Sequence, residues 1–276
     1  MSASSYVRVR RAQRSWTFAA MMAREIRVLR RNFLSTFIRV LLQPVLLIFV
    51  FGYVLPKVNA GGATSSGGTS FATVLLPGIV AEAMVTQGAM AVIVPLMMEL
   101  SWQRSITERA MAPLSIPLIA VQKMVAGALQ ALIGGLLVFP AVFLIHPAGQ
   151  GPQVHVSNWP MFVLVLLSCA LLGSSGGLLL GTSIPPQHVQ ILATVLMLPM
   201  TMLGCVYYPW SALEEISWLQ ILVLANPLVY ATEGMRAMLT PQVGNLPFVA
   251  IISVLVGGPV VLGWLAARKF TARVRV

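Results

Sequence analysis

Acidic residues are scarce in this sequence. Its 276 residues include no aspartate and only seven glutamates, against 18 lysines and arginines, and charged residues make up 9% of the chain. A soluble domain carries roughly a quarter charged residues, so this composition excludes an ordinary soluble fold. Carboxylates are among the usual general acids and bases, so few candidates remain for acid/base catalysis. We expect that the chain is not an enzyme.

Cysteine and histidine are also sparse. Cys169 and Cys205 both lie inside apolar runs, which indicates small packing residues rather than a disulfide framework. The three histidines lack the spacing of metal ligands, so we expect no metal site and no cofactor. The phosphate-binding pattern G-x-x-x-x-G-K-[ST] is missing, so this chain does not bind ATP in that manner.

Long apolar runs dominate what is present. The chain is 58% hydrophobic, with a mean hydropathy of +0.86. A helix needs about 20 apolar residues to cross a bilayer, and several runs reach that length. The net charge of +11 does not indicate nucleic-acid binding, because the basic residues follow the ends of apolar runs rather than forming one soluble face. The lipid bilayer is the expected surrounding.

The apolar pattern predicts an all-α integral membrane protein with six transmembrane helices. The predicted spans are 34–55, 71–98, 118–145, 159–182, 189–208 and 246–267. Prolines inside these spans, such as Pro44 and Pro140, do not argue against them, since membrane helices tolerate proline. We assign residues 34–272 to the transmembrane domain and residues 1–33 to a cytoplasmic N-terminal segment.

The end of that N-terminal segment predicts an amphipathic helix from Arg14 to Phe33. Its apolar residues recur every three or four positions: Phe18, Met22, Ile26, Leu29 and Phe33. Four arginines take the opposite face: Arg24, Arg27, Arg30 and Arg31. Such a helix suits the membrane surface, with arginines among the headgroups. Docking on a partner protein is the alternative.

Arginine and lysine bias sets the orientation of the spans. With both termini and the segment between the second and third spans in the cytoplasm, 16 of the 18 basic residues fall inside. Only Lys57 and Arg236 remain outside. The stretch from Pro209 to Leu239 then lies outside, where it is apolar but too short to span and is interrupted at Asn226-Pro227. We predict a re-entrant outer hairpin, which is tolerated where protein buries its irregular backbone.

Ionisable residues inside apolar segments are candidate functional residues. Glu82 lies within the second span, where an unpaired carboxylate costs several kcal/mol, and Gln87 follows it. Glu82 has two interpretations: a contact in a substrate path or proton site, or a structural acid bonded to a neighbouring helix. Glu233 and Arg236 are spaced i, i+3 and can pair on one helical face. Neutralisation within the hairpin is the simpler interpretation of that pair, and a gate is the other.

A compact charged segment separates the second and third spans. The stretch "ELSWQRSITERAMA", Glu99 to Ala112, predicts a short helix that Pro113 ends. Arg104 and Glu108 form an i, i+4 pair within it. A short polar helix at the cytoplasmic face can fit a groove in a partner and transmit its motion, whereas a solvated loop is the simpler interpretation.

Two sequences in this arrangement point to a family. "MELSWQRSITERAMAPLS" resembles the inner segment of type-2 ABC exporter membrane subunits, and "NPLVYATEGMR" resembles their Asn-Pro-x-x-Tyr…Arg segment before the last span. The resemblance covers nearly the whole chain and is to the branch of antibiotic-resistance and polysaccharide or lipo-oligosaccharide permeases. At Trp102-Gln103 the chain departs from the more acidic, glycine-containing stretch common there.

The resemblance implies an ATP-driven export permease in a bacterial-type inner membrane, with both termini cytoplasmic. Its partners would be two separate ABC ATPase subunits and a second membrane subunit, identical or different. The resemblance makes Glu99–Ala112 the ATPase-coupling helix, with these candidate contacts: Glu99, Trp102, Gln103, Arg104, Glu108 and Arg109. The candidate substrate path or gate comprises Glu82, Gln87, Tyr230, Glu233 and Arg236. An ion-coupled secondary transporter using Glu82 and a non-transporting membrane scaffold are the alternatives.

The predicted orientation can be tested by cysteine labelling. In a cysteine-free background, cysteines at Ser66 and Ser157 should react with an impermeant thiol reagent applied outside intact cells, because both positions face outward. A cysteine at Ser105 should be protected until the cells are opened. Labelling of Ser105→Cys from outside would overturn the orientation and the coupling assignment with it.

Overall fold

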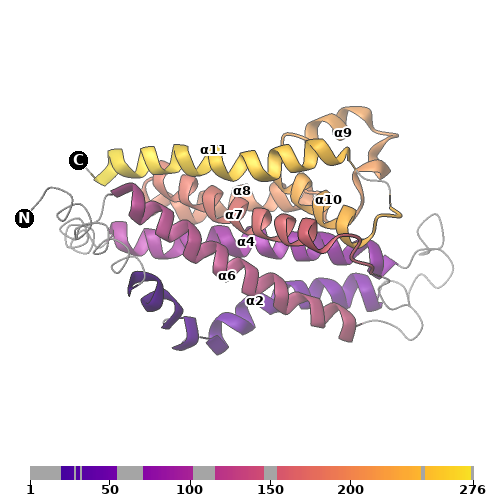
Figure 1. The fold of residues 1–276 in the computed structure, drawn as a ribbon, viewed down its shortest axis with the longest axis horizontal. Coiled ribbons are helices and arrows are strands. Elements are labelled where there is room, and N and C mark those ends of the chain that lie inside the picture. Colours follow the sequence, from indigo (N-terminus) through magenta and orange to yellow (C-terminus); the bar gives the residue numbers. More distant parts are fainter. Residues whose placement is uncertain are drawn as a thin grey trace, which may run out of the picture.

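The computed structural model describes residues 20–27, 29–31, 33–54, 71–101, 116–145, 154–243 and 246–274, and all regular structure in these ranges is helical. The elements form an elongated bundle, with α9 and α10 at one end and the last turns of α11 at the other (Figure 1). In chain order they are α2 (Phe33–Leu47), the π-helical η1 (Ile48–Val54), α4 (Phe71–Ser101), α6 (Ile116–Leu144), α7 (Trp159–Ser183), α8 (Pro186–Met202), the 3-10 turn η2 (Trp210–Leu213), α9 (Ser217–Val223), α10 (Pro227–Leu239) and α11 (Phe248–Val274).

Among the described residues, four helices are long and apolar enough to cross a membrane, and they confirm the all-α membrane class. These segments are Thr73–Glu99, Pro117–Ala141, Trp159–Ser183 and Phe248–Thr271. They coincide with the second, third, fourth and sixth predicted spans. The first and fifth predicted spans correspond to α2 with η1, which includes a shorter apolar stretch at Leu41–Val50, and to the 17-residue α8. Residues 20–27 and 29–31 are also helical, within the predicted amphipathic segment.

Two helix ends differ from the sequence-based expectation. Helix α8 ends at Met202, not at Tyr208, and Leu203 caps it. Cys205 then has a φ of 52°, a left-handed conformation that does not occur inside a right-handed helix. Helix α11 continues to Val274, beyond the predicted end at 267, because "RKFTARV" extends the helix with charged and polar residues that the apolar run does not include.

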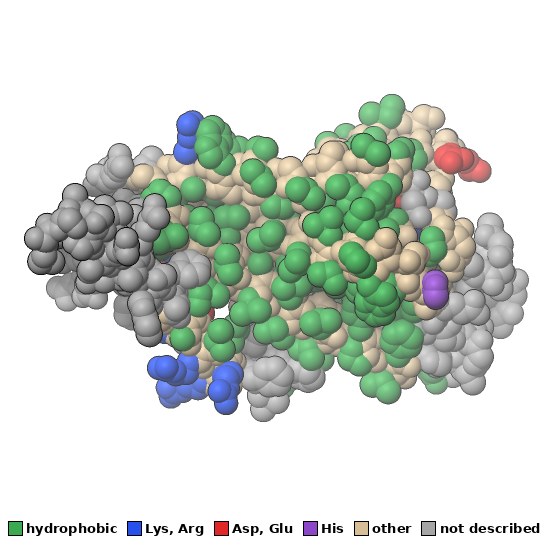
Figure 2. All heavy atoms as spheres, viewed as in Figure 1, with side chains coloured by type: hydrophobic (Ala, Val, Ile, Leu, Met, Phe, Trp, Pro, Cys, Tyr) green, Lys and Arg blue, Asp and Glu red, His purple; other side chains and the backbone are tan. Residues whose placement is uncertain are grey.

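The surface follows the division expected for a membrane protein. On the face in Figure 2, hydrophobic side chains (green) cover the length of the bundle. Lysine and arginine side chains (blue) lie toward one end, and acidic (red) and histidine (purple) side chains lie toward the other. Trp264 on α11 marks the basic end, where the Arg268 guanidinium lies 3.7 Å over its ring. Such a pair suits the boundary between lipid tails and headgroups.

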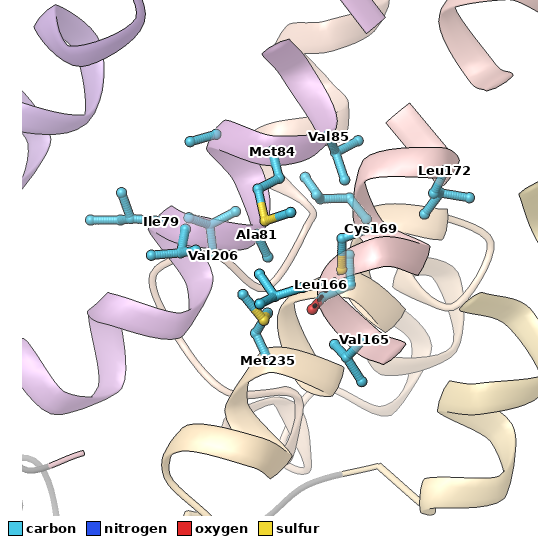
Figure 3. Close-up of a cluster of buried hydrophobic side chains, with 14 of the residues drawn as sticks. Ile79, Ala81, Met84, Val85, Val165, Leu166, Cys169, Leu172, Val206 and Met235 are labelled. Carbon is cyan, nitrogen blue, oxygen red and sulfur yellow. Dashed lines mark hydrogen bonds between the residues drawn. The ribbon is translucent and has the colours of Figure 1, made fainter. Parts of the chain in front are cut away.

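Helix α4 lies in the middle of the bundle and packs against α6, α7 and α10. Side chains from α4, α7, α10 and the turn after α8 meet in one buried cluster (Figure 3), which includes Ile79, Met84, Val85, Val165, Leu166, Cys169, Leu172, Val206 and Met235. Lipid tails are as apolar as the surfaces of membrane helices, so no hydrophobic effect drives these helices together. Their association depends on close packing instead. The central helix therefore needs neighbours that fit it closely.

Two glycines allow α7 to approach α4. A Cβ atom on Gly173 would lie 2.3 Å from the Val85 carbonyl oxygen, and one on Gly177 would lie 2.4 Å from the Ala89 carbonyl oxygen. The spacing of four residues places both glycines on one face of α7. This is the small-xxx-small pattern of membrane helix interfaces. Gly176, between them in sequence, faces open space.

Alanine substitutions should distinguish Gly173 and Gly177, which lie against α4, from Gly176, which faces open space. Gly173→Ala and Gly177→Ala should each destabilise the protein by about 1–3 kcal/mol, the usual cost of overpacking, because backbone atoms cannot move aside easily. Gly176→Ala is the matched control and should be neutral or stabilising, because alanine is the better helix former. Thermal unfolding in detergent measures all three. Equal midpoints would contradict the close approach of α7 to α4.

Candidate functional site

The chain between α8 and α10 is mostly not helical, so its backbone N–H and C=O groups need hydrogen-bond partners elsewhere in the protein. In the interior of a membrane protein each unsatisfied backbone group costs several kcal/mol. The segment from Leu203 to Asn226 contains only the short η2 and α9. Its polar backbone groups are therefore the first requirement that the surrounding structure has to meet.

Side chains at the start of α10 meet part of that requirement. The Asn226 side chain caps α10 by accepting a hydrogen bond from the Leu228 amide at 3.0 Å, and its Nδ2 donates to the Met200 carbonyl at 2.7 Å. One turn on, the Tyr230 hydroxyl donates to the Leu224 carbonyl at 3.1 Å. Asn-Pro at the N-cap and N1 positions is a strong helix start, so the same pair begins α10 and holds the end of α8.

A second group of α10 side chains holds the turn after α8. Thr232 Oγ1 donates to the Gly204 carbonyl at 2.8 Å, and Arg236 Nη2 donates to the Cys205 carbonyl at 2.8 Å. Glu233 Oε1 accepts from the Trp210 amide at 3.0 Å. The left-handed conformation of Cys205 is thereby fixed by bonds to its own carbonyl and to its neighbours.

Glu233 and Arg236 form an ion pair that is completely buried, with 0% exposure of either side chain. Breaking a buried pair costs about 3–5 kcal/mol, because the remaining charge loses its partner in a medium of low dielectric. The two atoms of this pair without a hydrogen-bond partner in the described part of the chain are Glu233 Oε2 and Arg236 Nε. The pair neutralises itself inside the protein, as its i, i+3 spacing suggested.

The turn after α8 also touches α4. A Cβ atom on Gly78 would lie 2.0 Å from the Val206 carbonyl oxygen, so only glycine fits at this contact. Glu82 lies one helical turn further along the same face of α4. The turn, α4 and Glu82 therefore belong to one neighbourhood.

Glu82 itself is buried, with 2% of its surface exposed. Gln43 Nε2 on α2 donates to Glu82 Oε1 at 3.3 Å, and Pro44 follows directly in the sequence. Thr86 Oγ1 donates to the Glu82 backbone carbonyl at 2.7 Å. Gln87 is half-buried on the same helix. A buried carboxyl thus joins α4 to α2 through one long hydrogen bond.

Glu99 lies in the last turn of α4, and Lys123 Nζ on α6 lies 2.7 Å from its Oε2. The other predicted coupling residues, Trp102, Gln103, Arg104, Glu108 and Arg109, lie outside the described residues. The structure thus brings together Tyr230, Glu233 and Arg236 on α10, and it places Glu82 and Gln87 on α4. Sequence reasoning missed Gln43, Thr232 and Lys123, whose partners are distant in sequence and leave no local pattern.

A cavity of about 470 Å³ lies beside this neighbourhood. It is lined mostly by apolar residues from α4, α7, α8 and the α9–α10 connection, among them Val85, Gly173, Met197, Leu203 and Asn226. The predicted path residues are not in its lining. In the described part of the chain, no group of three or more histidine, cysteine or acidic residues is placed to hold a metal ion.

Comparison with known proteins supplies the family. The sequence model of the ABC-2 type transporter family matches residues 17–240. A search of curated proteins finds no match. The matched range contains Glu82, the segment from Glu99 to Ala112 and the whole of α10. Because the match covers most of the chain, it confirms the resemblance, and the chain belongs to the ABC-2 type transporter family.

Proposed function

We propose that this chain is the membrane permease of an ATP-driven exporter that moves a hydrophobic or amphipathic substrate, such as a drug, a lipid or a glycan-lipid. The observation that carries the proposal is the family match over residues 17–240, since the family's chains are permease components of ABC transporters. ATP hydrolysis then belongs to two separate ATPase subunits, and a second membrane subunit, identical or different, completes the assembly. The complex resides in a bacterial-type inner membrane.

The proposed topology has six spans, with α2–η1 as the first and α8 as the fifth. Large apolar side chains exposed on these two helices support it, because lipid or a second membrane subunit would cover them: Ile38, Leu42, Leu46, Ile191, Val195 and Leu198. The stretch from Pro209 to Leu239, together with the turn that precedes it after the early end of α8, is the proposed re-entrant hairpin on the outer side. Its internal hydrogen bonds, described above, are what such an element requires.

The apolar cavity supports a substrate with a hydrophobic portion. Its 470 Å³ falls within the usual range of ligand pockets, about 300–1,000 Å³, and apolar cavities of this kind favour apolar ligands over water. Helix α4 contributes Val85 and Ala89 to the cavity lining, and Glu82 and Gln87, which lie on α4 outside that lining, are the proposed polar contacts elsewhere along the path. The buried contacts of Tyr230, Glu233 and Arg236 favour a part in shaping the outer gate over direct substrate contact.

The segment from Glu99 to Ala112 is the proposed contact with the ATPase. Its charges stand between two membrane helices on the side that the arginine bias places in the cytoplasm. Exposed ion pairs contribute under about 1 kcal/mol to folding, so these charges are not needed for stability alone. At a desolvated interface the loss of one charged partner costs about 2–5 kcal/mol of association.

The triple variant Arg104→Ala, Glu108→Ala, Arg109→Ala tests this contact. We expect normal membrane insertion with weaker capture of the ATPase that co-purifies with the wild-type chain, or ATP hydrolysis uncoupled from export. Pull-down of the ATPase and efflux from cells provide the two readouts. Trp102→Ala should weaken capture further if the indole fills a pocket in the partner.

The matched control removes two exposed charges from the opposite end of the molecule, Glu214→Ala and Glu215→Ala. This control should retain both capture and efflux. If the triple variant also retains wild-type values in both assays, the coupling assignment is wrong.

Glu82→Gln tests the substrate path. It keeps the size of the side chain and a hydrogen bond to Gln43, so the complex should assemble normally. If Glu82 contacts substrate, stimulation of ATP hydrolysis by substrate should change by about five-fold or more, the lower end of coupling between sites. Thr86→Val, one turn away, is the control and should leave stimulation unchanged. Poor assembly of Glu82→Gln would favour the structural interpretation, and unchanged assembly and stimulation would remove Glu82 from the path.

A further inference from the structure

The ion pair between Glu99 and Lys123 links the two helices that precede and follow the charged segment in the sequence. Glu99 is in the last turn of α4, and Lys123 is in the second turn of α6, so the pair joins the two helices from which the segment at 102–115 emerges. The two charged atoms lie 2.7 Å apart, and the side chains of Lys123 and Glu99 are only 9% and 16% exposed. The pair is therefore an internal link rather than a solvated surface contact.

Helix α4 contains a proline, a residue at which helices bend readily, shortly before this ion pair. Pro95 lies four residues before Glu99, inside the helix and exposed at the surface. Proline has no amide hydrogen, so the carbonyl of Ala91 lacks its helical partner, and such positions are where helices bend. A force applied beyond Pro95 bends the end of α4 more easily than it moves the whole helix.

On the N-terminal side of Pro95, α4 already packs closely against α6. A Cβ atom on Gly127 of α6 would lie 2.5 Å from Val92 Cγ2 and 3.3 Å from the Gly88 carbonyl oxygen. Leu96, directly after the proline, is fully buried in a cluster with Ile119 of α6. The last turn of α4 follows this packing, and within it Glu99 pairs with Lys123 of α6.

We propose that the Glu99–Lys123 pair is a clamp that lets α4 and α6 move as one body when the segment between them is displaced. Glu99 is then a positioning residue for coupling rather than an ATPase contact. The proposal deepens the proposed function and rests on it, because the displacement would come from the ATPase. The clamp prevents bending at Pro95 from absorbing that displacement.

Helix α4 then carries the motion outward. Seventeen residues separate Glu99 from Glu82, which at 1.5 Å per residue is about 25 Å along the helix. Gly78, one turn further, contacts the turn that α10 holds in place. One continuous helix, kept from bending at Pro95 by the clamp, therefore connects the clamp, the buried carboxyl and the outer hairpin.

Hydrogen exchange on the purified chain tests the clamp without any ATPase. Glu99→Gln and Lys123→Met should each speed exchange of amides 97–101 by about five-fold or more, because the last turn of α4 loses its tie to α6. Amides 79–93 should exchange as in the wild type. Lys269→Met is the control lysine, since its Nζ donates to Ser183 at 3.0 Å from an exposed position on another helix pair. Unchanged exchange at 97–101 would overturn the clamp.

Charge reversal separates the ion pair from other effects of substitution. The double variant Glu99→Lys with Lys123→Glu should restore slow exchange, whereas each single reversal should not, because it places like charges together. Failure of the double variant where both singles are fast would show that the pair does not act as a pair.

The part of the clamp in coupling is tested on the complex with its co-purified ATPase. A cysteine at Thr86, in a background without the two native cysteines, reports the motion of α4 through its rate of reaction with a small methanethiosulfonate reagent. In the wild-type complex, ATP with vanadate should change this rate. Lys123→Met should retain ATPase capture and phosphate release but reduce the ATP-dependent change by about five-fold or more.

Adding Pro95→Ala should recover much of the loss in Lys123→Met, because it restores the missing helical hydrogen bond and stiffens α4. A purely stabilising ion pair predicts no such rescue. A full ATP-dependent change in the reaction rate of the Lys123→Met variant would overturn the clamp. Failure of the wild-type chain to capture an ATPase would instead overturn the proposed function. In that case the hydrogen-exchange experiment would still decide on the clamp.

Discussion

The constraint on which this structure depends is that polar backbone within a membrane protein has to be bonded inside the protein. The long helices meet most of it through their own hydrogen bonds, with exceptions at internal prolines such as Pro95. The chain from Leu203 to Asn226 does not, and α10 supplies what is missing through Asn226, Tyr230 and Thr232. The buried Arg236 completes the set at the Cys205 carbonyl, and Glu233 neutralises its charge. The irregular segment between α8 and α10 is therefore held in place by side chains at the start of and within α10.

Helix α4 occupies the centre because other elements can approach it closely. Gly173 and Gly177 bring α7 against its backbone, Gly127 does the same for α6, and its own Gly78 admits the turn after α8. Close packing without a hydrophobic driving force makes these contacts the source of cohesion. A displacement of α4 is consequently felt by three neighbours, which suits a helix that receives motion at one end.

The sequence was most informative where structure is local. Apolar runs of sufficient length predicted the four spanning helices, and the i, i+3 spacing of Glu233 and Arg236 predicted their pairing. The early end of α8 could not be predicted, because it depends on bonds from Asn226 and Thr232 that only the fold brings near. Lys123 lies 24 positions after Glu99, so no local pattern marked their pair.

The scarcity of acidic residues acquires a physical meaning in the folded chain. Three of the described acidic residues each join two elements: Glu82 bonds to Gln43 of α2, Glu99 pairs with Lys123 of α6, and Glu233 ties α10 to the amide of Trp210. Carboxylates are costly in this environment unless they are paired, so they remain only where such a junction compensates the cost. The three junctions differ in strength, since Glu233 is fully buried with a charged partner, whereas Glu82 has one neutral donor at 3.3 Å. A moving α4 would thus release α2 more readily than it would break the bonds of Glu233 to Arg236 and Trp210.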